Sequence, residues 1–376
     1  MTDNNKQYGA DLVVDSLINH DIDYVFGIPG AKIDRIFDTL EDKGPQLIVA
    51  RHEQNAAFMA QGIGRITGTP GVVITTSGPG VSNLATGLVT ATDEGDPVLA
   101  ISGQVKRADL LKRSHQSMKN VAMMEPVTKY AVEVHEPDTL SETIANAYRV
   151  AKSGKRGASF VSIPQDVTDS LVSVKAIKPL TDPQLGSASV GDINYLAQAI
   201  RNADLPVLLL GNGASTRAVT KSIRKLLDAV KLPVVETFQG AGIVSRELEE
   251  DTFFGRVGLF RNQPGDMLLK KADLVIAIGY DPIEYEARNW NAEISARIIV
   301  IDVAQAEIDT YFQPERELIG NIADTIDLLL PAVNGYVLPK ASVDYLQNLK
   351  KNVVEDVKFD RNSKEGLVHP LDVIDV

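Results

Sequence analysis

The sequence predicts an α/β protein made of two doubly wound domains, each with a parallel sheet. Short apolar runs typical of buried strands alternate with helical patterns along most of the chain. Several runs lead into glycines, at 27–30, 78–80 and 211–213, as expected where a parallel strand turns towards a helix. A length of 376 residues exceeds one ordinary core, and a stretch rich in proline, glycine and serine at 169–192 divides the two series of runs.

These patterns assign each part of the chain. We expect a first domain at 1–168, a linker at 169–192, a second domain at 193–336 and a helical, polar segment at 337–376. The first domain has expected strands at 24–26, 47–50, 72–76, 97–103 and 157–164, the last of them closing the sheet. The second has expected strands at 206–210, 233–235, 274–278 and 298–301. Apolar residues recur at helical spacing at 8–20 and 217–230.

Composition excludes several classes of function. A net charge of −12 argues against nucleic-acid binding, which needs a basic face. The absence of cysteine excludes disulfides and thiolate metal sites, and the five histidines show no metal-ligand spacing, so we expect no metal site within the chain. The N-terminal residues lack the regions of a signal peptide, and no apolar run reaches the length of a membrane span. We therefore expect a cytoplasmic protein without membrane contact.

Glu53 is the strongest candidate for chemistry. It follows the apolar run at 47–50 and precedes Ala56, Ala57 and Ala60 at helical spacing, so it lies where a strand leads into a helix. Open α/β sheets bind ligands at this edge. The helix N-terminus favours the carboxylate anion and burial favours the neutral acid, a balance suited to exchanging a proton with a bound heterocycle. The alternative is that Glu53 only caps the helix or pairs with Arg51.

Three segments carry a family resemblance: ARHEQNAAFMAQGIGRITG at 50–68, FGIPGAKID at 26–34 and TTSGPGVSNLATGL at 75–88. Together they resemble the pyrimidine-binding domain of thiamine diphosphate enzymes and, among these, the catabolic, FAD-independent acetolactate synthases. The similarity extends over essentially the whole chain. The resemblance implies a decarboxylating condensation of two pyruvate molecules to 2-acetolactate and CO2 on the acetoin route, in a homodimer or homotetramer.

The resemblance also assigns site residues. It implies that Glu53 is catalytic and hydrogen-bonds the aminopyrimidine ring of thiamine diphosphate, and that Gln116 enters the active site to position the substrate. The other cofactor-binding residues that it implies are Pro29, Gly30, Ala31, Thr76, Pro79 and Asn83. In the family, a third domain binds the diphosphate through Mg²⁺ with a Gly-Asp-Gly motif, which this sequence lacks. We therefore expect a truncated chain that is inactive alone, in which residues 337–376 form a helical linker and the start of the missing diphosphate-binding domain.

Two other functions stay open. One is an anabolic acetohydroxyacid synthase of branched-chain amino acid biosynthesis, or a pyruvate oxidase relative, which tightly bound FAD would reveal. The other is a non-catalytic scaffold that pairs with intact subunits. The run at 211–214, Gly-Asn-Gly-Ala, matches half of a dinucleotide fingerprint, but we favour a Rossmann-like domain with an empty site and do not expect FAD.

Polar residues of the second domain have no assigned role. Tyr280, Asp281, Glu284 and Tyr285 gather at a strand's carboxyl end, a common position for binding loops. Before that strand, a segment that includes Asp266 is consistent with a solvated loop.

Overall fold

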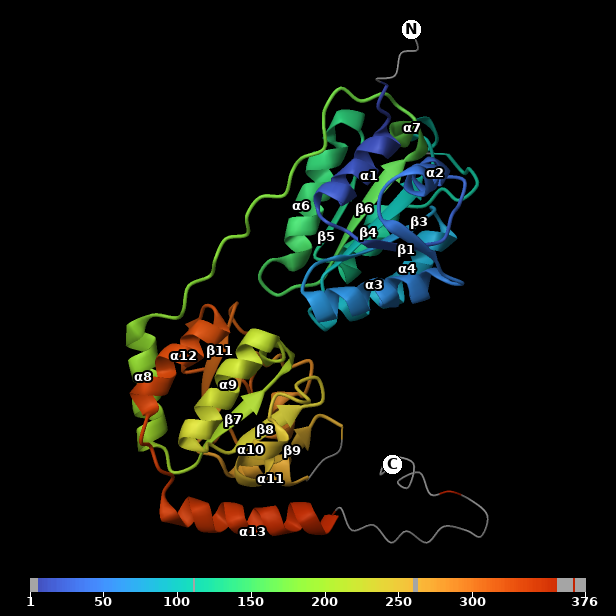
Figure 1. Ribbon diagram of the computed structural model, residues 1–376. Coiled ribbons are helices and arrows are strands. Elements are labelled where there is room, and N and C mark those ends of the chain that lie inside the picture. Colours follow the sequence, from blue (N-terminus) through green and yellow to red (C-terminus); the bar gives the residue numbers. More distant parts are fainter. Residues whose placement is uncertain (1–5, 111, 260–262, 357–367, 369–376) are drawn as a thin grey trace. The chain divides into compact units, whose positions relative to one another are not determined.

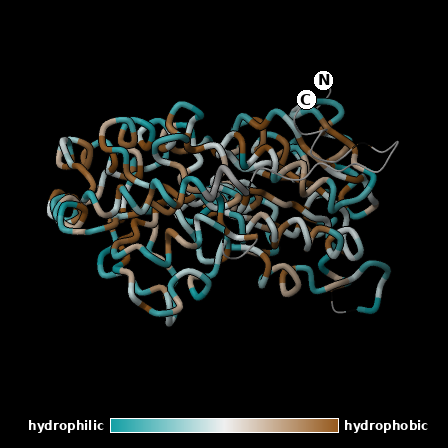
Figure 2. Tube along the Cα trace, turned by 90° about the horizontal axis from the view of Figure 1, so that it is seen from below, coloured by the Kyte–Doolittle hydropathy of each residue, from teal (hydrophilic) through white to brown (hydrophobic). Residues whose placement is uncertain are grey.

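The structure is a computed structural model that describes residues 6–110, 112–259, 263–356 and 368. The chain divides into two compact units, Met1–Pro183 and Gln184–Val376, and each is described by itself (Figure 1). Within the units, apolar stretches, brown in Figure 2, run through the interior, and hydrophilic stretches, teal, lie mainly on helices and loops. No helix in the described part of the chain is long and apolar enough to cross a membrane.

The first unit contains a six-stranded sheet in the order β2-β1-β3-β4-β6-β5, and all of its strand pairs are parallel. Its strands are β1 (Tyr24–Gly27), β2 (Gln46–Val49), β3 (Gly71–Thr75), β4 (Val98–Gln104), β5 (Tyr130–Glu133) and β6 (Ala158–Pro164). The expectation that residues 157–164 close the sheet is wrong, because β5 pairs beyond β6 and forms the edge. The side chains of β5 are only partly buried, and its sequence has an apolar run of just three residues before Glu133.

Helices cover both faces of this sheet (Figure 1). One face carries α1 (Gly9–Asn19), α2 (Asp34–Asp42) and α6 (Leu140–Lys152), and the other carries α3 (Glu53–Thr67), α4 (Pro79–Asp93) and α5 (Asn120–Met124). The short helices are α7 (Gln165–Thr168) and the 3-10 turns η1 (Arg107–Asp109), η2 (Glu125–Val127) and η3 (Pro137–Thr139). Helices α3 and α4 pack closely at Gly87. A Cβ at this position would lie 2.4 Å from the Cβ of Ala57, so the contact requires glycine.

The second unit has its own six-stranded sheet, in the order β12-β11-β10-β7-β8-β9, again with parallel pairs throughout. Its strands are β7 (Pro206–Leu210), β8 (Val234–Thr237), β9 (Phe253–Val257), β10 (Leu274–Ile278), β11 (Arg297–Asp302) and β12 (Arg316–Ile319). The two edge strands, β9 and β12, are not among the predicted strands. The prediction of two doubly wound α/β domains with parallel sheets is nevertheless confirmed.

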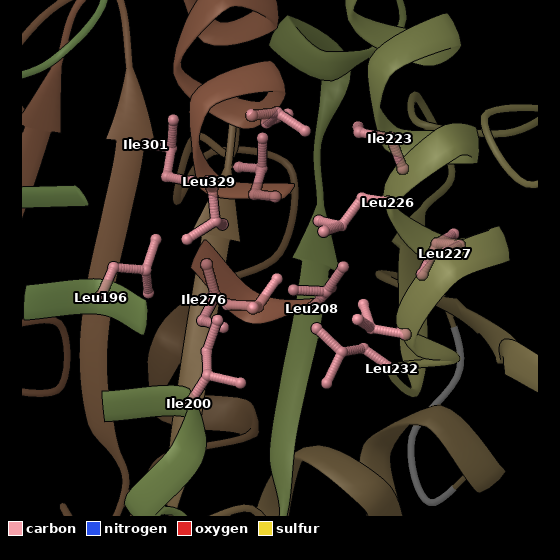
Figure 3. Packing of buried hydrophobic residues seen from close by; sticks show 14 of the residues in the cluster. Leu196, Ile200, Leu208, Ile223, Leu226, Leu227, Leu232, Ile276, Ile301 and Leu329 are labelled. Atoms are coloured by element: carbon pink, nitrogen blue, oxygen red, sulfur yellow. The ribbon is translucent and has the colours of Figure 1, made fainter. Parts of the chain in front are cut away.

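One face of the second sheet packs against α8 (Val190–Asn202), α9 (Arg217–Val230) and α12 (Ile322–Val333). Figure 3 shows this core, where Leu208, Ile276 and Ile301 of the strands meet the apolar side chains of the three helices. The opposite face packs against α11 (Pro264–Lys271) and α13 (Lys340–Asp356). The remaining helical elements are α10 (Arg246–Thr252), η4 (Asn212–Ala214) and η5 (Ala287–Asn289).

Three details differ from the sequence-based expectations. Helix α8 begins inside the predicted linker, because the Ser189 hydroxyl accepts a hydrogen bond from the Asp192 amide and caps the helix there. Helix α13 belongs to the second unit, since Leu346 and Leu349 are buried in its core. Asp266 does not lie in a solvated loop: it is fully buried, and its carboxylate accepts hydrogen bonds from the Gln263 amide and the Tyr285 hydroxyl.

Candidate active site

The candidate site lies where the order of the first sheet reverses. Strand β1 lies between β2 and β3: β2, the next strand in the sequence, pairs on one side of β1, and β3 pairs on the other. Open α/β sheets bind ligands at such a reversal, beyond the carboxyl ends of the strands. The loops that follow β1 and β3 touch there. A Cβ at Gly30 would lie 2.6 Å from the Cβ of Thr76, so only glycine allows the two loops to come this close.

Glu53 is the first residue of α3 and is only 9% exposed. The preceding His52 caps the helix, since its Nδ1 accepts a hydrogen bond from the Gln54 amide at 3.2 Å. One carboxylate oxygen of Glu53, Oε2, accepts a hydrogen bond from Nδ2 of Asn83 at 2.9 Å. The carboxyl group is therefore held at the N-terminus of a helix, where the helix dipole favours a negative charge.

The first turn of α4 closes over Glu53. Gly78 precedes the helix with φ of 63°, and Pro79 is its first residue, a position where proline costs no hydrogen bond. A Cβ at Gly80 would lie 2.6 Å from Thr75 Oγ1 and 3.4 Å from Glu53 Oε1. Glycine at this position thus brings the backbone of α4 against the carboxylate.

Three hydroxyl groups follow one another at the end of β3. The Oγ atoms of Thr75, Thr76 and Ser77 are buried, and none has a hydrogen-bond partner in the described part of the chain. Most buried polar atoms in proteins are hydrogen-bonded, and those that are not call for an explanation such as a bound group. Thr75 and Thr76 lie beside Gly80, which also approaches Glu53, so their unpartnered hydroxyls indicate a place for a polar ligand.

Gln116 comes to this place from the loop after β4. Its Cα would lie 3.1 Å from a Cβ at Gly78, and its backbone has φ of 63°, a left-handed conformation that is uncommon for residues other than glycine. Asn120 anchors the end of the loop, because its Nδ2 donates to the Gly103 carbonyl at 3.1 Å and to Ser162 Oγ at 3.2 Å. The loop is therefore fixed beside the turn that opens α4.

An ion pair fixes the start of the same loop. The backbone amide and Nε of Arg107 donate to the two carboxylate oxygens of Asp166 at 2.9 and 2.8 Å. Partial burial of Asp166 acts to raise its pKa, but the hydrogen bonds and positive charge of Arg107 outweigh it and lower the pKa below its ordinary value.

The structure thus places most of the predicted site residues together. Gly30, Thr76 and Gln116 lie in contacting loops, and Asn83 reaches Glu53 directly. Pro79 starts the helix that covers the carboxylate, whereas Pro29 and Ala31 are exposed neighbours of Gly30. The predicted site residues do not include Thr75, Ser77 or Gly80, although the run Thr-Thr-Ser before two glycines was a visible signal.

Among the described residues, no group of three or more histidine, aspartate or glutamate side chains could hold a metal ion.

Two family models match the chain, one in each unit. Residues 7–123 match the N-terminal TPP-binding domain of thiamine pyrophosphate enzymes, and residues 193–329 match the central domain of the same enzymes. Thiamine pyrophosphate, or TPP, is another name for thiamine diphosphate. The first match contains Glu53, Asn83 and Gln116, so the candidate site lies in the domain that binds this cofactor in the family.

Curated relatives agree with these matches. The chain is 50% identical over 369 residues to an acetolactate synthase of Bacillus subtilis (strain 168) and 44% identical over 368 residues to a catabolic acetolactate synthase of Raoultella terrigena. A probable acetolactate synthase large subunit of Methanocaldococcus jannaschii is 29% identical over 363 residues. The first two alignments cover 98% of this chain and the third covers 94%. The chain spans 65%, 66% and 61% of the lengths of these relatives. The two matched domains and these similarities show that the chain belongs to the thiamine pyrophosphate enzymes, in a group whose curated relatives are acetolactate synthases.

Proposed function

We propose that this chain supplies the pyrimidine-binding half of a catabolic acetolactate synthase, an enzyme that condenses two pyruvate molecules to 2-acetolactate and CO2. The observation that carries the proposal is the Glu53 carboxylate, held by Asn83 at a helix N-terminus beside unpartnered hydroxyls. Similarity to a catabolic relative at 44% identity, against 29% for a large subunit, supports the catabolic type.

The residues present fit an aminopyrimidine ring. A heterocycle with ring nitrogens and an amino group offers hydrogen-bond donors and acceptors to Glu53 and to the hydroxyls of Thr75 and Thr76. The close packing at Gly30 and Gly80 holds the loops that carry Thr76, Thr75 and Glu53 together at this place. We assign Pro29, Gly30, Ala31, Thr76, Pro79 and Asn83 to this binding surface.

Glu53 is the group that holds and moves a proton. Asn83 occupies Oε2, so Oε1 is the oxygen that faces the ligand beside Gly80. A carboxyl group within hydrogen-bond reach of a ring nitrogen is placed to exchange a proton with it. When bound, thiamine diphosphate supplies the nucleophilic carbon and the electron sink for decarboxylation. Gln116, beside the α4 turn, positions the second pyruvate.

The diphosphate and its Mg²⁺ are assigned to residues outside the described part of this chain. A diphosphate needs a divalent cation or dense cationic contacts. The 376 residues contain no Gly-Asp-Gly motif, and the described residues offer no cluster of metal ligands. We therefore expect the 376-residue chain alone to form no acetolactate.

The active form is a homodimer or homotetramer. Met59 and Ile66 lie seven residues apart on one side of α3 and are 44% and 85% exposed, which leaves an apolar face on the helix that begins at Glu53. Ile66→Lys is expected to lower the self-association of the chain in sedimentation velocity. Identical sedimentation of the two proteins would contradict this role of the α3 face.

The test joins this chain to the part of the Bacillus subtilis relative that follows the aligned region. We expect the chimera, with thiamine diphosphate, Mg²⁺ and pyruvate, to form acetolactate, and Glu53→Gln in the chimera to lower turnover by about 100-fold or more with an unchanged circular dichroism spectrum. A folded chimera without product, or a Glu53→Gln chimera with full activity, would reject the proposal. Acetolactate formed by the 376-residue chain alone would reject the part of the proposal that assigns the diphosphate and Mg²⁺ to residues outside the described part of this chain.

A further inference from the structure

The second unit has the topology of a dinucleotide-binding domain. Strand β7 lies between β10 and β8, so the order of this sheet also reverses at its first strand. The loop after β7, Gly211–Ala214, occupies the position where such folds hold the phosphates of a dinucleotide. Glu236, near the end of β8, occupies the position of the acidic residue that binds a ribose in those folds.

A carboxylate of the chain itself lies at the phosphate position. Glu284, from the loop after β10, accepts hydrogen bonds from the Asn212 amide at 3.1 and 3.0 Å to its two oxygens. Oε1 also accepts from the Asp281 amide at 3.1 Å, and Oε2 accepts from the Thr237 hydroxyl at 2.6 Å. The loops after β7 and β10 and the last residue of β8 thus direct their donors to one anionic group.

The loops around Glu284 leave no space for a second anion. A Cβ at Gly211 would lie 2.5 Å from the Gly279 carbonyl oxygen and 2.7 Å from Glu284 Oε1, and a Cβ at Gly213 would lie 2.8 Å from the Cα of Gly279. The backbones of the two loops are in contact at these glycines. In this domain the glycines allow the loop after β7 to contact the loop after β10. In a dinucleotide site the corresponding glycines allow the loop to contact the phosphates.

The ribose position is also occupied from within the chain. Glu236 is buried, Oε1 accepts a hydrogen bond from the Val244 amide at 2.7 Å, and Oε2 lies 3.8 Å from Nε of Arg256. Burial raises the pKa of both Glu236 and Glu284, which agrees with carboxyl groups enclosed by protein. A dinucleotide such as FAD or NAD therefore does not fit the residues present.

We propose that Glu284 is a built-in anion that occupies the phosphate position of the second unit and keeps this crevice closed to phosphate esters. The donors that converge on it would bind an inorganic oxyanion once the side chain is removed, because the Asn212 and Asp281 amides and the Thr237 hydroxyl would lose the acceptor that they share. This proposal concerns the second unit only and is independent of acetolactate formation.

The test compares wild-type, Glu284→Ala and Glu284→Gln chains in phosphate and in chloride at equal ionic strength. Trp290, the single tryptophan, is buried in the second unit and reports its thermal unfolding. We expect phosphate to raise the unfolding temperature of Glu284→Ala by a saturable 2–4 °C, roughly. Wild type and Glu284→Gln, in which the site stays filled, should show no difference between the two salts. Equal temperatures for Glu284→Ala in both salts would overturn the proposal.

Two further arms keep the test decisive. If Glu284→Ala does not fold unaided, refolding is measured in formate, phosphate and chloride: higher yields in the first two support the built-in anion, and equal yields overturn it. The wild-type chain is titrated with ADP while the Asn212 and Asp281 amide resonances are observed. Unchanged resonances are expected, and saturable shifts at both amides would show an open site and overturn the proposal.

Discussion

Asn83 Nδ2 donates a hydrogen bond to Glu53 Oε2 at 2.9 Å and thereby joins the N-terminal parts of α4 and α3. The two residues are 30 positions apart in the sequence, and each follows a different strand of the sheet. Their contact fixes which carboxylate oxygen is engaged by protein and which faces the ligand position beside Gly80.

Replacement of Asn83 tests this contact. Asn83→Ala is expected to destabilise the first unit by about 1–3 kcal/mol, because a nearly buried carboxylate loses a donor. Asn83→Asp places a second carboxylate beside Glu53, so its cost should be larger at pH 7 than at pH 4.5, where a shared proton relieves the repulsion. Urea unfolding followed by circular dichroism at the two pH values measures both effects. Equal stability of Asn83→Asp at the two pH values, relative to wild type, would contradict the contact.

The inner strands of both sheets could be predicted from the sequence, and of the four edge strands only β2 could. Strands such as β3, β7 and β10 are buried on both faces and therefore read as continuous apolar runs. The missed strands, β5, β9 and β12, lie at sheet edges, where part of each strand faces solvent and polar residues interrupt the run. Their pairing depends on neighbours that local sequence does not identify.

The candidate site also has a part that the sequence predicts and a part that only the structure shows. Glu53 could be located because a strand, a carboxylate and a helical pattern follow one another in the sequence. The contacts of Gly30 with Thr76, and of Gly80 with Thr75, join loops that only the order of strands brings together. The role of Glu284 was hidden for the same reason, since its donors come from the carboxyl ends of three different strands.

Two glycine substitutions distinguish a glycine required by close packing between loops from one that only adds flexibility to a helix. Gly30→Ala is expected to destabilise the first unit by about 1–3 kcal/mol, because its Cβ would overlap Thr76. Gly62, inside α3, is the matched control: a Cβ there meets no atom within 4 Å, so Gly62→Ala should stabilise the helix by about 0.5–1 kcal/mol. Thermal unfolding measured by circular dichroism compares them. A neutral Gly30→Ala would show that the loops are farther apart than described.

The buried carboxyl group of Glu236 gives the second unit a pH dependence. Burial raises its pKa above the ordinary value of 4.5, so the folded unit binds a proton more readily than the unfolded one. Its contribution to stability is present below pH 4.5 and is lost as pH rises through the folded pKa. Glu236→Gln is therefore expected to reduce the loss of stability of the second unit on going from pH 4.5 to 7.5. Urea unfolding followed by Trp290 fluorescence measures the stability of the second unit at the two pH values. Glu293→Gln, at an exposed position, is the control. A Glu236→Gln variant with the same pH dependence of stability as wild type would contradict this prediction.

The backbone of Gln116 supplies the last prediction. Its φ of 63° costs an L residue roughly 1 kcal/mol or more, a strain that proteins keep where a side chain has a task. Gln116→Gly should therefore stabilise the 376-residue chain by about 0.5–1 kcal/mol, whereas Gln116→Ala, which keeps the strain, should not. In the chimera with the Bacillus subtilis relative, both variants should raise the KM for pyruvate, because both lack the amide. If Gln116→Gly is more stable and equally active, the left-handed backbone belongs to the loop's fold, and the amide has no part in positioning the substrate.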